Sequence, residues 1–262
     1  MTGMVPPHSH AGQRALVTAA ATGIGRVTAQ ALLDAGAQVF ICDSDQARLA
    51  SALASDPRLH GLPCDVTLEA EVIALFAAAI RQLGGLDILI NNAGVSGPTA
   101  LVEETSLADW RHCLAVNLDA SFLCAREAAP HMRRQGSGSI VNMSSTAGLF
   151  GLPRRAPYAS AKWAIRGLTR TLAQELGPHG VRVNCICAGS VRGERIDRVI
   201  AAEAANTGMQ EGTVRAQYTD AVSLRTFISP DDIANTILFL TSAAGARISG
   251  QDITVDGHTE TF

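Results

Sequence analysis

The amino-acid sequence predicts an α/β fold, in which a doubly wound parallel sheet of about seven strands carries helices on both faces. From Arg14 onward, short β-branched runs alternate with longer Ala- and Leu-rich stretches of helical period, a pattern typical of repeated βαβ units. Nearly all of the short runs are apolar on both faces, which favours buried parallel strands over an antiparallel sheet with one wet face. The 262 residues, 47% of them hydrophobic, are enough for one domain with a large core.

The expected strands follow the apolar runs, and the expected helices fill the stretches between them. We predict strands at residues 14–18, 38–43, 58–64, 86–91, 138–144, 182–187 and 252–255. We predict helices at residues 25–35, 46–54, 69–83, 107–134, 156–177 and 230–242. Residues 190–227 interrupt the alternation, because they are more polar and contain no strand-like run. We therefore expect a single domain over residues 13–262, with 190–227 as a substrate lid.

Composition and charge limit the partners of the protein. A formal net charge of −3, without a block of like charges, gives no long-range attraction to nucleic acid or to an anionic membrane. No run reaches the roughly 18 uninterrupted apolar residues that cross a bilayer. Residues 1–12 show neither a signal-peptide core nor an Arg-rich amphipathic pattern, and we expect them to be a flexible lead-in. A small-molecule partner and a cytoplasmic location are the resulting expectations.

The six cysteines are expected to be buried, reduced thiols. They lie mostly in apolar runs, and none forms the CxxC pair typical of zinc or thiol-redox sites. Cys185 and Cys187 share one face of a predicted strand, but two ligands alone make a poor metal site. We predict no bound metal.

A glycine-containing turn follows the first predicted strand and precedes a helical stretch. Gly23 and Gly25 allow the backbone to approach a pyrophosphate closely, and the free N–H groups at the helix start offer hydrogen bonds to it. Asp43 ends the second strand about twenty residues further on, where a carboxylate can accept hydrogen bonds from both adenosine ribose hydroxyls and repels a 2′-phosphate. NAD is therefore favoured over NADP, although the nearby Arg48 argues the other way. The alternative is that Asp43 only caps a loop.

Tyr158 and Lys162 are four residues apart in a predicted helix, so their side chains lie on one face. Alcohol oxidation needs a base within hydrogen-bond reach of the hydroxyl, and tyrosine, with a pKa near 10, is a poor base at neutral pH. A lysine cation beside it favours tyrosinate. Taken alone, the pair is more typical of an exposed helix surface than of a catalytic site. Ser145 ends a strand and can hold the substrate oxygen, whereas Asn117 disturbs its helix unless it serves a purpose.

From about Arg14 to about Gly257 the chain resembles the short-chain dehydrogenase/reductase family. The matching pieces occur in order at Thr18-Ala19-Ala20-Ala21-Thr22-Gly23-Ile24-Gly25, Asp65-Val66, Asn91-Asn92-Ala93-Gly94, Asn117, Ser144-Ser145 and Tyr158-Ala159-Ser160-Ala161-Lys162. Ser145, rather than Ser144, precedes Tyr158 by the family's usual thirteen residues. The resemblance implies a Rossmann fold and a catalytic tetrad of Asn117, Ser145, Tyr158 and Lys162, in which Asn117 supports a water-mediated proton path to Lys162.

The resemblance also implies the cofactor contacts, with Asp65 and Val66 at the adenine and the Asn92-Ala93-Gly94 turn along the cofactor. The full expected set is Thr18, Ala20, Thr22, Gly23, Ile24, Gly25, Asp43, Asp65, Val66, Asn92, Ala93, Gly94, Tyr158, Lys162, Gly189, Ser190 and Val191.

Three positions depart from the family pattern. Ala19 replaces the first glycine of the cofactor loop, and since alanine avoids positive φ, a modest loop adjustment is expected. Ala188 replaces a proline, which is expected to loosen a turn beside the nicotinamide. Gly193 stands where a threonine often holds the nicotinamide carboxamide, and Ser190 is a candidate to take over that hydrogen bond.

The substrate residues are expected among the arginines of the lid and of the loop before Tyr158. Arg192 and Arg195 are candidates to meet an anionic substrate group, and Arg154 with Arg155 forms a second cationic pair. The alternative is a solvated face on which these arginines pair with neighbouring acids. With only 4% aromatic residues, the sequence favours a small polar alcohol, such as a polyol, sugar or hydroxy acid, over a polycyclic substrate.

The leading hypothesis is an NAD-dependent oxidoreductase that interconverts a hydroxyl and a carbonyl. One alternative is reduction of a 3-oxoacyl thioester, against which Asp43 argues, because such reductases commonly use NADPH. Another is a non-catalytic NAD-binding sensor or scaffold, against which the complete proton-transfer set argues. Residues 107–134 and 156–177 carry more apolar surface than one sheet face needs, and relatives pair such helices between subunits. We therefore expect a homotetramer, with residues 250–262 at a second interface.

Overall fold

The computed structural model describes residues 9–259 and contains a seven-stranded sheet with the order β3-β2-β1-β4-β5-β6-β7. Every neighbouring pair is parallel. The strands are β1 (Arg14–Thr18), β2 (Gln38–Asp43), β3 (Leu59–Pro63), β4 (Ile88–Asn91), β5 (Gly138–Ser145), β6 (Val181–Ala188) and β7 (Asp252–Val255). The order reverses between β1 and β4, and in such sheets ligands bind at the carboxyl ends of the strands near this point. The predicted fold class is confirmed.

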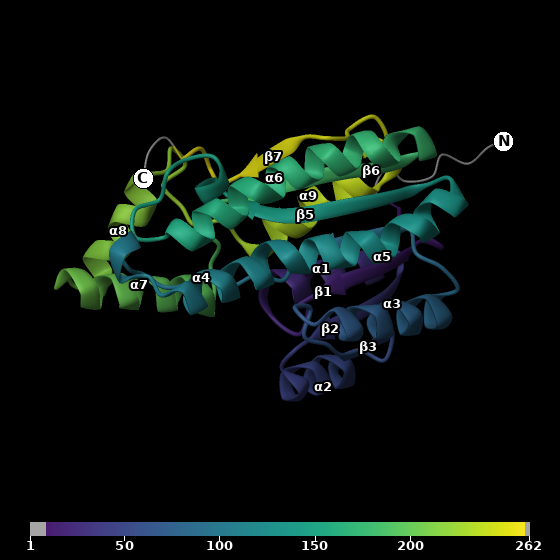
Figure 1. Ribbon diagram of the computed structural model, residues 1–262, viewed down its shortest axis with the longest axis horizontal. Helices are drawn as coiled ribbons and strands as arrows, with labels where there is room; N and C mark the ends of the chain where they lie inside the picture. Colours follow the sequence, from purple (N-terminus) through teal and green to yellow (C-terminus); the bar gives the residue numbers. More distant parts are fainter. Residues whose placement is uncertain (1–8, 260–262) are drawn as a thin grey trace.

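Helices cover both faces of the sheet, as Figure 1 shows. The helices are α1 (Gly23–Asp34), α2 (Gln46–Ser55), α3 (Glu69–Leu83), α4 (Leu107–Leu114), α5 (Ala120–Gln135), α6 (Ala156–Leu176), α7 (Glu194–Thr207), α8 (Glu211–Asp220) and α9 (Pro230–Thr241). One core layer joins the sheet to α1, α2 and α9. The other joins it to α3, α5 and the end of α6. The alternation of strand side chains produces this division, since Ala15 and Val17 of β1 face one layer and Leu16 faces the other.

The helix predicted over residues 107–134 is interrupted by a π-helical turn at Ala115–Asp119, between α4 and α5. A π turn widens the helix by one residue and is frequent at functional sites. Asn117 lies in this turn and is fully buried. The sequence predicts local side-chain bonding by Asn117 but not the π turn. One extra residue in a turn barely changes the spacing of apolar residues, so the pattern over residues 107–134 still looks like one continuous α-helix.

Residues 190–227, expected as a lid without a strand, contain the helices α7 and α8. These helices lie beyond one end of the sheet (Figure 1) and pack on each other through a small apolar cluster of Ile196, Ile200, Ala204 and Val214. The segment stays tied to the sheet region by a parallel bridge between Val191 and Ile228.

The end of the predicted flexible lead-in is packed. His10 is fully buried; its Nε2 lies 2.8 Å from the Thr241 hydroxyl, and its backbone N–H donates to Ala35 O. The expectation of a flexible segment is therefore wrong for His10, and residues 1–8 lie outside the described part of the chain. Among the described helices, none combines the length and apolar character needed to cross a membrane.

Candidate active site

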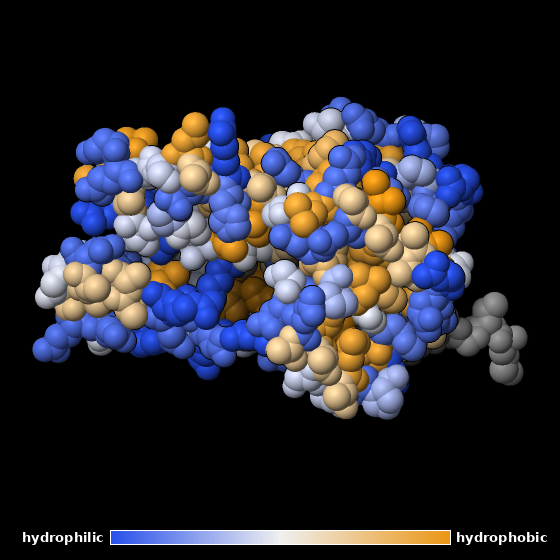
Figure 2. Space-filling view, turned by 60° about the horizontal axis from the view of Figure 1, so that its bottom comes forward, coloured by the Kyte–Doolittle hydropathy of each residue, from blue (hydrophilic) through white to orange (hydrophobic). Residues whose placement is uncertain are grey.

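A cavity of about 1010 Å³ opens at the carboxyl ends of the central strands, between the sheet and α7 with α8. Figure 2 shows a hollow between the end of the molecule that holds these helices and the body of the sheet. One part of the wall comes from the loops after β1, β2 and β4, and the other comes from the end of β5, the start of α6 and the segment of residues 190–222. The two parts are described in turn.

The loop after β1 is tightly packed. A Cβ at Gly25 would lie 2.5 Å from Ala19 O and 2.6 Å from Asn92 Nδ2, so only glycine fits where the loop meets the start of α1. Ala19 itself adopts φ +49, the left-handed conformation that glycine usually supplies. Ala19 thus takes the positive φ that alanine is expected to avoid, and it bears a strain of about 1 kcal/mol.

Thr18 and Asn92 join the loops after β1 and β4. The Thr18 hydroxyl accepts from the backbone N–H groups of Asn92 (3.0 Å) and Ala93 (3.1 Å). In return, Asn92 Nδ2 donates to Thr18 O and Ala19 O. These bonds join the loops after β1 and β4 at the wall of the cavity.

Asp43 ends β2 and lines the cavity. Its Oδ2 accepts from Ala21 N–H (3.1 Å), and its Oδ1 accepts from Asp45 N–H (3.0 Å). The loop-capping interpretation of Asp43 is therefore confirmed, and each carboxylate oxygen that accepts one backbone bond keeps capacity for a further donor. The basic neighbour Arg48 forms ion pairs with Asp45 (3.4 Å) and Glu194 (3.3 Å).

The expected cofactor residues fall into two groups in the structure. Those that line the cavity are Thr22, Gly23, Ile24, Asp43, Asn92, Gly94, Tyr158, Lys162, Gly189, Ser190 and Val191. Those outside its lining are Thr18, Ala20, Gly25, Asp65, Val66 and Ala93. Asp65 uses its Oδ1 to accept from the backbone and hydroxyl of Thr67, which shapes the loop after β3.

Ala188 and Gly193 are the two remaining positions that depart from the family pattern, and the structure shows the local conformation of each. Ala188 is the last residue of β6 and pairs with Ser145 and Val255 on the adjacent strands, and Gly189 N–H donates to Val255 O (3.0 Å). The turn that was expected to be loosened is thus held by the sheet. Gly193 has φ +138 just before α7, a conformation that threonine rarely adopts.

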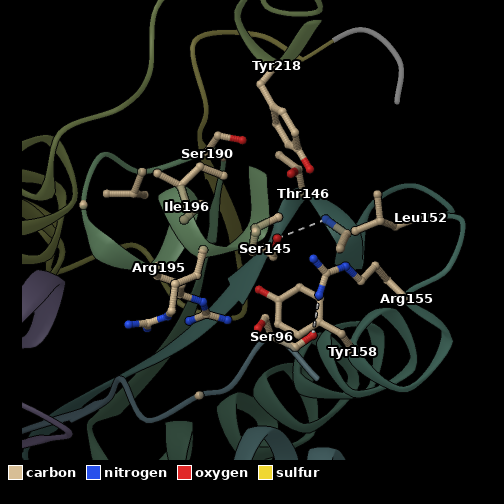
Figure 3. A pocket seen from close by; sticks show the side chains of 18 of the residues that line it. Ser96, Ser145, Thr146, Leu152, Arg155, Tyr158, Ser190, Arg195, Ile196 and Tyr218 are labelled. Carbon is tan, nitrogen blue, oxygen red and sulfur yellow. Dashed lines mark hydrogen bonds between the residues drawn. The ribbon is translucent and has the colours of Figure 1, made fainter. Parts of the chain in front are cut away.

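Tyr158, Lys162 and Ser145 meet at the floor of the cavity. Tyr158 and Lys162 lie one turn apart on α6, and Lys162 Nζ is 5.6 Å from the centre of the Tyr158 ring. Lys162 is only 2% exposed and donates to Met143 O (2.8 Å). The Ser145 hydroxyl, at the end of β5, accepts from Ala147 N–H (3.2 Å) and points toward Tyr158 (Figure 3).

Electrostatics at this floor favour tyrosinate. Burial alone raises the pKa of Tyr158, but the charges of Arg195 and Lys162 and hydrogen bonding with Ser145 more than offset it, so the net pKa lies below its usual value. Burial likewise lowers the pKa of Lys162, and the Tyr158 phenolate opposes that shift. The two groups are thus set to exchange and hold a proton closer to neutral pH than either does in water.

Asn117 lies beside this pair but holds its amide elsewhere. Its Nδ2 donates to Val95 O (3.0 Å) and Cys113 O (2.9 Å), whereas its Oδ1 is buried without a hydrogen-bond partner. A Cβ placed on Gly94 would lie 2.9 Å from this Oδ1 and 3.5 Å from Lys162 Nζ, so all three groups share one small space. A buried acceptor without a partner fits a water molecule placed between Asn117 and Lys162.

Arginines line the substrate side of the cavity. Arg195 lies over the Tyr158 ring, with Cζ 5.6 Å from its centre. Arg154 is exposed, and Arg192 donates to the Thr226 hydroxyl (3.2 Å). Sequence reasoning placed Arg155 only in a secondary pair, yet it is 8% exposed and reaches the cavity. Its position directly before α6 and three residues before Tyr158 was the available signal.

Tyr218 of α8 was not predicted as a site residue. It lines the cavity and donates its hydroxyl to Glu203 (2.8 Å). No motif marks it, because its position depends on how α8 packs on α7.

A metal at this site or elsewhere has little support among the described residues. The ligand atoms of Cys185, Cys187 and Asp252 lie within 4.8 Å of one another. However, Asp252 already accepts from Arg166 (2.9 Å) and Arg170 (2.6 Å), and two cations beside the cluster disfavour a third.

Known proteins share both the sequence and this architecture. A family model described as Enoyl-(Acyl carrier protein) reductase matches residues 18–258. The L-fucose dehydrogenase of Bos taurus is 35% identical over 251 residues, covering 96% of this chain and 90% of that protein. The D-beta-hydroxybutyrate dehydrogenase of Rhizobium meliloti is 33% identical over 251 residues, covering 93% of this chain and 96% of that protein.

Among solved structures, that of an NAD+-bound xylitol dehydrogenase superimposes with a TM-score of 0.91 at 30% identity, covering 95% of this chain and 99% of that chain. The ordered motifs, the parallel sheet and the grouping of Ser145, Tyr158 and Lys162 agree with these likenesses. The chain therefore belongs to the short-chain dehydrogenase/reductase family and is an oxidoreductase that acts on CH–OH groups.

Proposed function

We propose that the protein interconverts a hydroxyl and a carbonyl of a small polar substrate with NAD(H), and that Tyr158 is the acid/base. The observation that carries this proposal is the position of Tyr158 on the cavity floor between two cations, Lys162 and Arg195, with a lowered pKa. In a tyrosine–lysine pair on an exposed helix surface, the lysine would not be buried and the two side chains would not line a cavity together with Ser145.

In the oxidation direction, the Ser145 hydroxyl donates a hydrogen bond to the substrate oxygen and orients it toward Tyr158. The Tyr158 phenolate takes the hydroxyl proton as the C–H bond breaks, and the bound NAD+ supplies the hydride acceptor. Lys162 stabilises the phenolate while it awaits the proton. Asn117 Oδ1 holds a water that passes the proton on from Lys162 to solvent. In reduction, each proton transfer runs in reverse.

The loop after β1, together with the start of α1, supports binding of a dinucleotide. Gly25 leaves no room for a Cβ, and the start of α1 presents backbone N–H groups toward the cavity. Asp43 would accept from the adenosine ribose, which favours NAD over NADP, and Arg48 is engaged by two acids rather than free for a 2′-phosphate. Ser190 is proposed to hold the nicotinamide carboxamide, and residues 190–227 are proposed to act as the lid over the substrate.

The substrate is proposed to be a polyol, sugar or hydroxy acid. The relatives are named for both neutral and acidic alcohols: L-fucose and xylitol on one side, hydroxybutyrate on the other. Arg192, Arg195 and Arg154 remain the sequence-based candidates for an anionic group.

A 3-oxoacyl thioester reductase is the second candidate. The description of the matching family model, which names an acyl carrier protein, favours it. Asp43 argues against it, because the carboxylate repels the 2′-phosphate of NADPH.

We also propose a homotetramer and a cytoplasmic location. Phe122 of α5 and Trp163 of α6 are each 48% exposed, and paired helices of two subunits would cover them. All six cysteines are free and buried, as expected of reduced thiols.

The test of the function is NAD reduction by the purified protein across a panel of neutral and acidic alcohols. We expect turnover with NAD that far exceeds turnover with NADP. Thioester reduction with NADPH but no alcohol oxidation would favour the second candidate. NAD binding without turnover of either class would favour a sensor.

A further inference from the structure

The lining of the cavity carries an excess of positive charge. Among the described residues it includes six arginines and three acidic residues: Arg48, Arg154, Arg155, Arg192, Arg195 and Arg198, with Asp43, Glu194 and Glu203. Arginines in such excess either form ion pairs with acids outside the lining or can bind an anionic ligand. The partners of each arginine distinguish the two cases.

Most of these arginines are already engaged or lie in solvent. Arg48 and Arg198 both pair with Glu194, at 3.3 and 3.6 Å. Arg192 donates to Thr226, and Arg154 is exposed. Only Arg155 and Arg195 border Tyr158, and neither forms an ion pair with any acid in residues 9–259.

Arg155 is the unusual member, because its charge is buried and has no acidic partner among residues 9–259. One nitrogen, Nη1, donates to the carbonyl oxygens of Ser96 (3.1 Å) and Gly97 (3.4 Å), which fixes the guanidinium in place. Glu203, the acid whose charge acts on Arg155, accepts a hydrogen bond from Tyr218 instead. Burying an unpaired charge is costly, and five donors in a rigid fork leave several unused. Binding of an anion would offset the cost of burying the Arg155 charge.

Arg195 lies on the opposite side of Tyr158 from Arg155 (Figure 3). It lies in the first turn of α7, and Figure 3 shows Tyr158 between Arg195 on one side and Arg155 on the other. The Arg155 side is fixed by backbone carbonyls, whereas Arg195 is on an exposed helix face and can adjust to the ligand.

We propose that Arg155 and Arg195 together bind a carboxylate of the substrate, so that the preferred substrate is a hydroxy acid whose hydroxyl lies against Ser145 and Tyr158. This inference rests on the proposed function, in which Tyr158 is the acid/base. Guanidinium forks bind carboxylates through paired, charge-assisted hydrogen bonds. A carboxylate adds one negative charge beside the Tyr158 phenolate, whereas a doubly charged phosphate adds two and would oppose formation of the phenolate more strongly.

The first experiment compares matched substrates on the NAD-loaded enzyme. Plateau values of kcat/KM, taken where they no longer change with pH, are measured for 3-hydroxybutyrate and for its neutral counterpart 1,3-butanediol, and likewise for gluconate and glucitol. The wild type is expected to prefer the acids. Arg155→Gln and Arg195→Gln should each lower the ratio of kcat/KM for an acid to that for its neutral counterpart on the order of 30-fold or more.

Arg198→Gln is the matched control, because it removes a guanidinium one turn along α7 that already pairs with Glu194. It should leave the acid-to-neutral ratio unchanged. Arg155→Lys keeps the charge but not the fork and should recover part of the acid activity. Equal losses on acids and neutral alcohols, or a wild type without acid preference, would overturn the proposal while leaving the proposed function intact.

A binding measurement separates the proposal from the proposed function. Calorimetric titration of the NADH-loaded protein with butyrate, and with butyramide as the neutral control, requires no turnover. Butyrate binding that is lost in Arg195→Gln supports the carboxylate site even if no alcohol is oxidised. Butyrate and butyramide binding equally, or not at all, would reject it. The retained activity of each variant on 1,3-butanediol, or its cooperative thermal unfolding, shows that it is folded.

Discussion

The two parts of the cavity wall are built on different principles. On the cofactor side, the loops after β1 and β4 are joined by Thr18 and Asn92, and polar groups such as Asp43 already have backbone partners. On the substrate side, Arg155 and Arg195 have no acidic partner within the part of the chain that the structure describes, and α7 and α8 pack on each other through a small apolar cluster. A wall whose polar groups are already hydrogen-bonded suits a cofactor that does not vary. A wall with unpaired charges suits selection among different substrates.

The largest expected effect concerns the group that both halves share. Tyr158→Phe removes the proton acceptor while leaving the ring, and we expect kcat to fall by about 10³-fold or more, within the range of general acid–base catalysis. NADH fluorescence titration should show little change in cofactor binding, because the loop after β1 is untouched. Substantial remaining alcohol oxidation would contradict the role of Tyr158.

On the cofactor side, Asp43→Asn removes the charge that repels a 2′-phosphate while keeping a similar shape. We expect the ratio of kcat/KM for NADP to that for NAD to rise on the order of 30-fold, because relief of like-charge repulsion is worth a few kcal/mol. Asp45→Asn is the control, since Asp45 is exposed and pairs with Arg48. A similar rise in both variants would mean that Asp43 acts only as a loop cap.

On the substrate side, Arg195→Gln tests the charge over Tyr158. Arg195 helps to lower the pKa of Tyr158, so its removal raises that pKa. Oxidation requires the phenolate, and therefore the rise of kcat/KM with pH for 1,3-butanediol should move to higher pH. Arg198→Gln should leave this profile in place. An unchanged profile in Arg195→Gln would show that Lys162 and Ser145 tune Tyr158 without Arg195.

The smallest effect tests the rigidity of the cofactor half. Ala19→Gly relieves the strain of φ +49 and should stabilise the protein by up to about 1 kcal/mol, or roughly 2–4 °C in Tm. Ala20→Gly, at a buried neighbour without positive φ, should destabilise it by a similar amount. Differential scanning calorimetry compares the two variants. Destabilisation by both would mean that Ala19 is not strained.

Much of the fold and of the catalytic group could be predicted from the sequence. Short β-branched runs that are apolar on both faces define the seven strands to within two residues at each end, and the YxxxK spacing places Tyr158 and Lys162 on one helical turn. Such signals are local, since they depend on residues close together in the chain. The lid function, the tetramer and the choice of NAD stay predictions, because they depend on ligands or partner chains.

The sequence by itself determined the layered sheet and the residues that meet at its carboxyl edge, because strand and helix periodicity and the order of the motifs are properties of the chain. Tertiary structure alone decided which arginines are free. Arg154 and Arg155 are neighbours in the sequence, yet one lies in solvent and the other is buried against Ser96 and Gly97. Likewise, the left-handed Ala19 and the π turn at Asn117 result from contacts between distant segments, which override local preference.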